Sequence, residues 1–196
     1  APRQQRVATR RPRMTRGRAA LVSVLAAYQT DISVSITQLV VQKLAYLLHV
    51  RGELPTLRFV KGAYGPYAEN VNHALQAMDG HFLHGYGDRT TIANIEVDRN
   101  AAAEAAEFLA GEPEAEARVR AVEALIEGFE SPFALELLAT VHWAVHAGGA
   151  PNAAEAAKYI ASWSERKSRL FRRWHVDVAW ERLSALQWLD MAPARA

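Results

Sequence analysis

Two histidines four residues apart are the first candidates for chemistry in this sequence. His142 and His146 would lie on one face of a helix, as two metal ligands on a helix must. No third ligand accompanies them, and Trp143 and Val145 flank them within an apolar stretch. This context favours a half-buried structural pair, so we expect no metal ion.

A second pair of histidines lies in an irregular, glycine-rich segment. His81 and His84 are close to Tyr86 and Asp88, and such groups can titrate or bind a ligand. No nucleophile or metal ligand stands beside them, so acid–base chemistry here is the minor alternative.

Known catalytic motifs are missing from the rest of the chain. We find no phosphate-binding loop, no dinucleotide-binding glycine pattern after a strand and no His-Glu-x-x-His zinc motif. Ser35, Ser131 and Ser164 precede predicted helices, which explains them as helix caps. The chain also contains no cysteine. We therefore expect no cofactor and no enzymatic activity.

The charge of the chain is unevenly distributed along its 196 residues. Residues 1–18 contain seven arginines and no acidic residue, residues 19–157 carry a net charge of −9, and residues 158–196 carry +4. We interpret residues 1–13 as a solvated linker and residues 14–196 as one domain. The first methionine is Met14, which suggests a piece of a longer protein.

Hydrophobic periodicity predicts a mainly α fold, a compact multi-helix domain with a small two-stranded β ribbon. Helices are expected after caps at Thr15, Ser131, Asn152 and Ser164, and from Ser35 to the stop at Gly52. Further helices are expected over residues 66–79, 100–110, 113–128 and 175–189. The ribbon is expected to pair residues 57–61 with residues 91–97.

Aromatic residues and glycines are concentrated between residues 58 and 89. Tyrosines offer a large contact area with a polar tip, and glycines let a partner approach the backbone. An interface and a simple covering of the core fit this composition equally well.

Several segments resemble the C-terminal region of DarG antitoxins. They are Gln42–Leu48, Phe59–Asn70, Gly80–Asp88, Trp163–Lys167 and Val178–Leu183, which occur in the same order. The Lys-Leu-x-Tyr-Leu and Tyr-Gly-Pro motifs are also similar to those of the broader Panacea group of antitoxin domains. The resemblance covers residues 15–189.

The resemblance implies a non-enzymatic antitoxin domain that binds and inhibits DarT, a toxin that ADP-ribosylates thymidine in single-stranded DNA. A one-to-one complex with a DarT-type toxin is the implied partner arrangement. In this family an N-terminal macrodomain hydrolyses ADP-ribose from DNA, and we find no macrodomain pattern here. A cytoplasmic location without membrane contact is expected.

An acidic, aromatic surface is expected to occupy the toxin's DNA groove by mimicking DNA. Direct nucleic-acid binding by the acidic body is not expected. The predicted contact residues are Lys61, Tyr64, Tyr67, Glu69, Asn70, Asp79, His81, His84, Tyr86 and Asp88.

Two alternatives remain open at this point. One is a nucleic-acid-binding regulatory module that uses the basic C-terminal helices, with Arg166, Lys167, Arg169, Arg172 and Arg173 as its contact surface. The other is an enzyme that needs a metal ion or cofactor.

Overall fold

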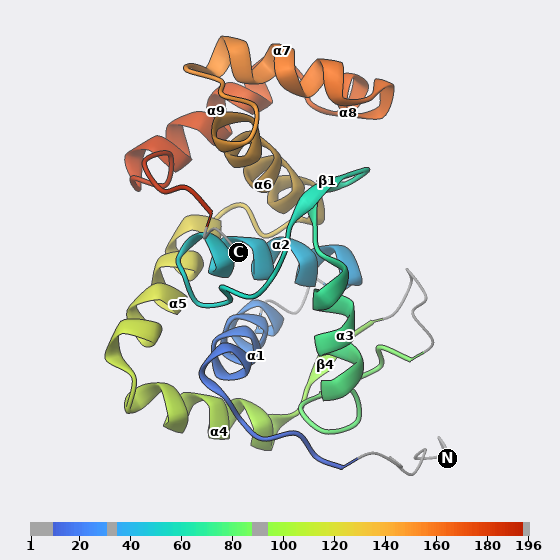
Figure 1. Cartoon of the computed structure of the whole chain (residues 1–196), viewed down its shortest axis with the longest axis vertical. Coiled ribbons are helices and arrows are strands. Elements are labelled where there is room, and N and C mark those ends of the chain that lie inside the picture. Colours follow the sequence, from blue (N-terminus) through green and yellow to red (C-terminus); the bar gives the residue numbers. More distant parts are fainter. Residues whose placement is uncertain (1–9, 31–34, 88–93, 194–196) are drawn as a thin grey trace.

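The structure, a computed structural model, describes residues 10–30, 35–87 and 94–193. The predicted mainly α fold is confirmed: these residues form nine helices and two short antiparallel ribbons (Figure 1). The helices are α1 (Arg16–Gln29), α2 (Gln38–Val50), α3 (Glu69–Met78), α4 (Arg99–Ala110), α5 (Pro113–Ile126), α6 (Pro132–His146), α7 (Ala153–Trp163), α8 (Glu165–Leu170) and α9 (Arg173–Ala185). The strands are β1 (Val60–Gly62), β2 (Gly65–Tyr67), β3 (Leu83–His84) and β4 (Glu96–Val97).

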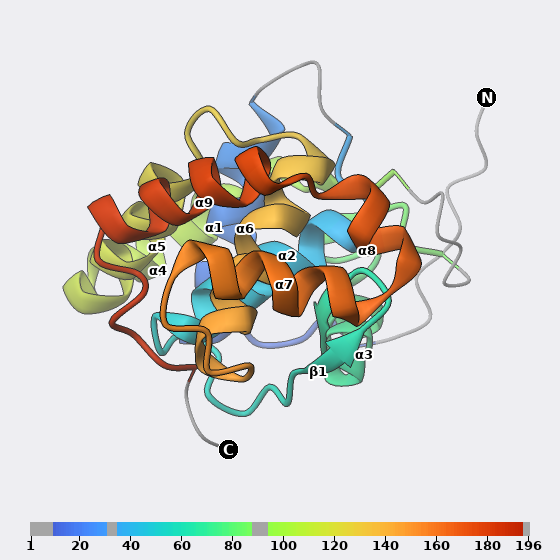
Figure 2. The same ribbon diagram turned by 90° about the horizontal axis from the view of Figure 1, so that it is seen from above.

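Helix α2 runs through the centre of the molecule. Every residue from Val40 to Val50 is buried, including Lys43 and His49. One side of α2 packs against α1 and α5, and α1 in turn packs against α4. The other side packs against α6, which α7 and α9 cover (Figures 1 and 2). Helix α2 therefore joins two groups of helices.

Four of the predicted helix caps and the predicted stop at Gly52 are present in the structure. The side chains of Thr15, Ser131, Asn152 and Ser164 accept hydrogen bonds from backbone N–H groups in the first turns of α1, α6, α7 and α8. Gly52 follows α2 with a positive φ of 91°, as a helix stop requires.

The predicted boundaries of α2 and α9 were wrong. The cap of α2 is Thr37, whose side chain accepts from the N–H of Val40, and not Ser35. Helix α9 spans Arg173–Ala185 instead of residues 175–189, because the chain turns after Ala185 and Gln187 takes a positive φ of 60°.

The predicted pairing of residues 57–61 with residues 91–97 was also wrong. Strand β1 instead pairs with β2, with Val60 opposite Tyr67 and Gly62 opposite Gly65. Only two residues separate the strands, so closing this hairpin orders far less chain than the predicted long-range pairing would.

The predicted helix start at Pro66 was also wrong, because this residue belongs to the β1–β2 hairpin. Pro66 lies opposite Lys61 in the hairpin, and α3 begins three residues later at Glu69. The segment at 94–97 pairs with β3, with His84 opposite Glu96, and Ile95 bridges to Ile36. Residues 91–93 of the predicted strand lie outside the described residues.

The predicted division into a linker (1–13) and a domain (14–196) stays a prediction. Among the linker residues that the structure describes, Arg11 contacts the folded body. Its guanidinium pairs with Glu104 and lies 4.7 Å from the ring centre of Phe82. In the described part of the chain, no helix has the length and apolar character needed to cross a membrane.

A buried carboxylate ties α2 to the helices on its lower side in Figure 1. Glu53, just after α2, accepts hydrogen bonds of 2.9 Å from the Nε and Nη2 atoms of Arg16 and of 2.8 Å from Arg118. Its side chain is fully buried, whereas both arginines are partly exposed. Burial raises the pKa of Glu53, but the hydrogen bonds from the two arginines outweigh it and hold the pKa below 4.5.

We expect Glu53→Gln to lower the free energy of unfolding at pH 7 by about 2 kcal/mol, because it leaves two arginines without their carboxylate. A carboxylate with a depressed pKa stabilises the fold above its unfolded pKa and loses that effect as the pH falls. The difference between wild type and variant should therefore shrink below about pH 4.5. Urea unfolding at several pH values measures it.

Glu114→Gln is the matched control. Glu114 is 3.8 Å from Arg118, but its side chain is 78% exposed, so its loss should change stability little. Equal effects of the two substitutions would contradict the role given to Glu53.

Candidate binding site beneath the hairpin

A cavity of 580 Å³ lies between the β1–β2 hairpin and the first turns of two helices. Helix α2 contributes residues from its first two turns, α6 contributes Pro132, and the hairpin covers the other side. The lining residues are Thr37, Gln38, Leu39, Gln42, Lys43, Ala63, Tyr64, Gly65, Tyr67 and Pro132.

Lys43 is the buried cation of this cavity. It is 1% exposed, and its Nζ donates a 2.7 Å hydrogen bond to the carbonyl oxygen of Pro66. Gly65 makes this approach possible, since it has a φ of +97° and a Cβ there would be 2.9 Å from Thr140 Oγ1 and 3.4 Å from Lys43 Nζ. The hairpin can therefore lie directly on the ammonium group.

A second buried lysine and a carboxylate continue the site beneath the hairpin. Lys167 Nζ donates to Glu136 at 2.5 Å and to Thr140 Oγ1 at 3.1 Å. Arg166 donates to both oxygens of Glu136, at 2.7 and 3.1 Å. Lys43, Lys167, Arg166 and Glu136 form what we call the Glu136 cluster, in which one carboxylate faces three cationic side chains.

The pKa directions follow from this excess of cations. Burial, and then repulsion from Lys167, lower the pKa of Lys43 to about 7. Burial raises the pKa of Glu136, but hydrogen bonds from Arg166 and Lys167 outweigh it and hold that pKa below its ordinary value. Glu136 is therefore ionised at neutral pH and serves as a counter-ion.

Two helix N-termini add to the positive potential. Thr37, Gln38 and Leu39 belong to the start of α2, and Pro132 is the first residue of α6. Helix N-termini carry partial positive charge and favour anions. The cavity is therefore suited to an anionic group.

The hairpin tip is held against α7 and α8. The ammonium of Lys61 lies 4.9 Å and 4.7 Å from the ring centres of Tyr159 and Trp163, and Trp163 Nε1 donates to Gly62 O at 3.1 Å. The guanidinium of Arg166 lies 4.5 Å from the ring centre of Tyr64, which stays 54% exposed at the rim of the cavity.

The structure brings three of the predicted contact residues together at the hairpin: Lys61, Tyr64 and Tyr67. Glu69 lies beside them, because Tyr67 donates a 2.5 Å hydrogen bond to its carboxylate. Asn70 instead organises the segment before β1, since its side chain donates to Thr56 O and accepts from the N–H of Arg58.

Asp79, His81 and His84 follow the C-terminal end of α3, whose ten residues span about 15 Å. Asp79 accepts from the backbone N–H groups of Tyr86 and Gly87, so it shapes its own loop. His84 is exposed and pairs with Asp98 at 3.3 Å, and His81 is partly buried. The described residues therefore do not form the single contact surface that was predicted.

Tyr86 was wrongly predicted as a contact residue. It is fully buried, because its segment folds onto the core beside Phe82 and Leu83. Asp88 lies outside the described residues.

Lys43, Glu136 and Thr140 were not predicted as site residues. Lys43 and Glu136 each lie in a mostly apolar run of a predicted helix. A charged residue inside an otherwise buried helix is the signal that was available, because such residues are seldom buried unpaired.

The histidine pair on α6 belongs to the core. Tyr46 donates to Nδ1 of His142 at 2.8 Å, and Nε2 of His142 donates to the carbonyl oxygen of Met191 at 2.9 Å. Burial and the neighbouring His146 lower the pKa of His142 to about 3, so the ring is neutral. Among the described residues, no group of three histidine or acidic side chains is placed to hold a metal ion.

Comparison with known proteins gives relatives over most of the chain. A DNA ADP-ribosyl glycohydrolase of Thermus aquaticus is 42% identical over 190 residues, which cover 93% of this chain and 52% of the relative. Proteins of the same name from Mycobacterium bovis and Mycobacterium tuberculosis are 35% identical over 186 residues, 87% of this chain and 53% of each relative. No protein-family model matches. The chain spans about half the length of the curated relatives it matches.

These names correct the interpretation drawn from the sequence. They describe an enzyme that acts on ADP-ribose attached to DNA. The predictions of a DarG C-terminal antitoxin domain, of a DarT-type toxin as partner, and of a chain without enzymatic function are therefore wrong by this comparison. The DNA-mimicking role given to the acidic surface is wrong with them. The net charge of −9 over residues 19–157 gave no sign of the cationic cluster, because the fold brings its members together from separate segments.

Proposed function

We propose that this chain is a helical part of a DNA ADP-ribosyl glycohydrolase, and that the cavity beneath the hairpin binds the diphosphate of ADP-ribose carried by DNA. The observation that carries this proposal is the 42% identity, over 93% of the chain, to a protein with that name. The cationic cavity supports it, since ADP-ribosylated DNA is anionic along its whole length.

The charge of the site suits a diphosphate. Glu136 pairs with Arg166 and Lys167, whereas Lys43 lines the cavity and is bonded to a neutral carbonyl oxygen, that of Pro66. An ammonium group has three donors, so Lys43 can hold a phosphate oxygen while keeping its hydrogen bond to Pro66 O. Hydrogen bonds between ionised partners are stronger than neutral ones, and a buried site strengthens them further.

The rim supplies a flat surface beside this charge. The exposed ring of Tyr64 lines the cavity and carries the Arg166 guanidinium on one face. Ribose and base rings pack well on aromatic side chains, and arginine is suited to phosphate. These groups bind and orient the substrate.

Gln42 has a structural role in this site. Its amide donates to Ala68 O at 2.9 Å and to Asn72 Oδ1 at 3.2 Å, and it accepts from the N–H of Ala68 at 3.0 Å. These bonds fix the base of the hairpin on α2. The expected cytoplasmic location is kept as part of this proposal, because the substrate is DNA.

We expect the chain to bind ADP-ribose and an ADP-ribosylated oligonucleotide, and Lys43→Met to weaken both about tenfold, because one charge-assisted hydrogen bond is lost. Calorimetric titration measures the affinities, and release of ADP-ribose from the oligonucleotide measures turnover. Methionine fills the same volume without a buried charge, so the fold should persist.

Lys158→Met is the control, since Lys158 is exposed on α7 and pairs with Glu155. It should bind both ligands as the wild type does. The proposal fails if the ADP-ribosylated oligonucleotide binds no more tightly than the unmodified one, or if both substitutions have the same effect.

Binding should also depend on pH through Lys43. Because its pKa is about 7, the lysine loses its proton as the pH rises from 6 to 8, and the affinity for ADP-ribose should fall over that interval. Bound phosphate favours the protonated form of Lys43, so its pKa is higher in the complex than in the free protein. In Lys43→Met the fall between pH 6 and 8 should disappear. An unchanged pH profile in this variant would remove Lys43 from the binding site.

A further inference from the structure

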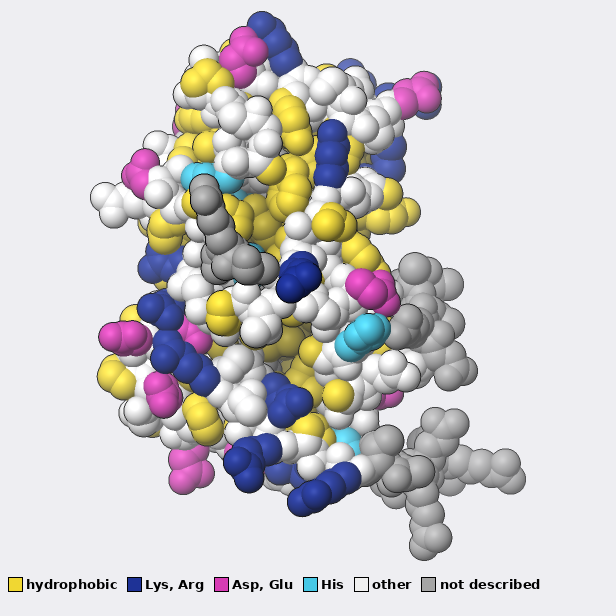
Figure 3. Space-filling model, in the orientation of Figure 1, with side chains coloured by type: hydrophobic (Ala, Val, Ile, Leu, Met, Phe, Trp, Pro, Cys, Tyr) yellow, Lys and Arg dark blue, Asp and Glu magenta, His cyan; other side chains and the backbone are white. Residues whose placement is uncertain are grey.

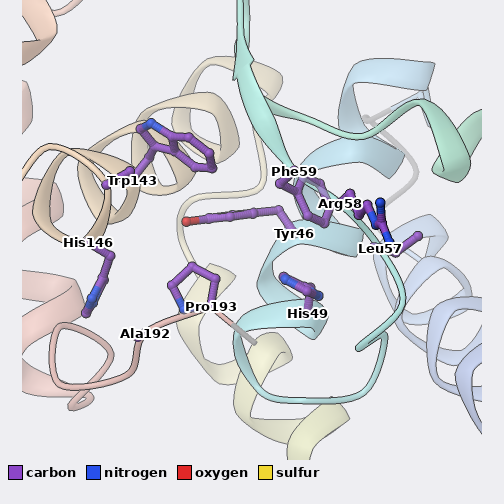
Figure 4. Close-up of a pocket in the computed structure, with 10 residues that line it drawn as sticks. Tyr46, His49, Leu57, Arg58, Phe59, Trp143, His146, Ala192 and Pro193 are labelled. Atoms are coloured by element: carbon purple, nitrogen blue, oxygen red, sulfur yellow. The ribbon is translucent and has the colours of Figure 1, made fainter. Parts of the chain in front are cut away.

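A second pocket, of 340 Å³, lies on the other side of the hairpin stem. Figure 4 shows its walls: Tyr46 and His49 come from α2, Trp143 and His146 from α6, and Arg58 and Phe59 from the segment before β1. Ala192 and Pro193 of the C-terminal segment complete it. In Figure 3 hydrophobic side chains gather in a hollow in the upper half of this face.

Aromatic rings form most of the wall. The rings of Tyr46 and Phe59 have centres 5.1 Å apart and meet edge to face, and Trp143 lies 6.2 Å from Tyr46 in a tilted arrangement. Tyr46 is fully buried and its hydroxyl is bound to His142, so its ring is fixed. Phe59 and Trp143 are only partly buried and remain accessible from the pocket.

Two polar groups accompany these rings. His146 lines the pocket, but its ring interacts with the backbone of Leu189 and with Asp190, and Nδ1 of His49 is engaged with the carbonyl oxygen of Leu54 at 2.7 Å. The exposed Arg58 lies on the lining and can meet a phosphate outside the pocket. A ring with polar edges, attached to a phosphate, fits this combination better than a purely apolar group.

We propose that this pocket binds a nucleobase of the substrate, packed against Phe59 and Trp143 with its attached phosphate near Arg58. The proposal rests on the proposed function, but it concerns a different pocket with its own residues. Stacking on aromatic side chains accepts any base, because every base has a flat π-face. The volume lies in the range of small-molecule sites, about 300–1,000 Å³.

Two parts of the substrate supply a nucleobase: the adenine of ADP-ribose and the bases of the DNA strand. AMP and a short oligothymidine distinguish them when each is titrated into the chain. Whichever source occupies the pocket should quench the fluorescence of Trp143 as it binds. Quenching by AMP alone assigns the pocket to adenine, and quenching by oligothymidine alone assigns it to the strand.

Substitutions of Trp143 provide the decisive comparison. Trp143→Ala should weaken the binding probe about tenfold by calorimetry, because a stacking surface is lost. Trp143→Phe keeps an aromatic ring, so it should stay within about threefold of wild-type affinity while most of the fluorescence quench disappears. Trp174→Phe, on the exposed face of α9, is the control and should keep both affinity and quench.

Three results would overturn the inference. They are the absence of binding by both probes, wild-type affinity in a folded Trp143→Ala, and a quench that persists in Trp143→Phe. Circular dichroism and thermal unfolding confirm that each variant is folded, and Trp143→Phe tests the site even if the alanine variant unfolds. The affinity for inorganic pyrophosphate, which has no base, should fall in Lys43→Met and stay unchanged in Trp143→Ala. Failure of the nucleobase site is therefore distinguishable from failure of the diphosphate site.

Discussion

The ion pairs of Glu136 are the interaction on which the site depends. Lys43 and Lys167 lie under the hairpin with almost no exposure, and burying two ammonium groups is costly without a compensating charge. Glu136 supplies that charge to Lys167 and Arg166, and the carbonyl of Pro66 supplies an acceptor to Lys43. Because one carboxylate faces three cations, the compensation is partial. A buried site left with excess positive charge is stabilised by an anion, which links the energetics of the fold to ligand binding.

The hairpin shapes the cavity beside these charged groups. Gly65 permits the backbone to lie on Lys43 and Thr140, and the contacts of Lys61 and Gly62 with Trp163 hold the tip on α7. On one side of the stem the hairpin roofs the cationic cavity, and on the other the preceding segment contributes Phe59 to the aromatic pocket. A small element that was predicted only as part of a weak ribbon therefore borders both pockets.

The sequence predicts features that depend on neighbouring residues, such as helix caps, but not contacts between segments that are far apart in the chain. The caps at Thr15, Ser131, Asn152 and Ser164 and the stop at Gly52 follow from single residues and their immediate neighbours, and the structure has them. In the Glu136 cluster, Glu136 of α6 pairs with Arg166 and Lys167 of α8, 30 and 31 residues away, and Lys43 of α2 bonds to Pro66, 23 residues away. No periodic pattern encodes such pairings. Lys61, Tyr64 and Tyr67 meet at a hairpin that was not predicted, since Lys61 was assigned to a strand of another ribbon and Tyr67 to a helix. Tyr86 was misjudged because burial of an irregular segment leaves no periodic pattern to detect.

Among the described residues, Glu53 and Glu136 each pair with more than one cation, on opposite sides of α2. Glu53 connects α1 and α5 below α2, with two partly exposed arginines for one carboxylate, and that cluster lines neither of the two pockets beside the hairpin. The Glu136 cluster connects α6 and α8 above α2 and adjoins the cationic cavity through Lys43. The two clusters share no residue and are separated by the width of a buried helix, so changes in them should act almost independently. Helix α2 therefore packs against α1 and α5 on one side and contributes Lys43 and Tyr46 to the two pockets on the other. This arrangement lets ligand-binding groups vary in charge without loosening the packing of α1, α4 and α5.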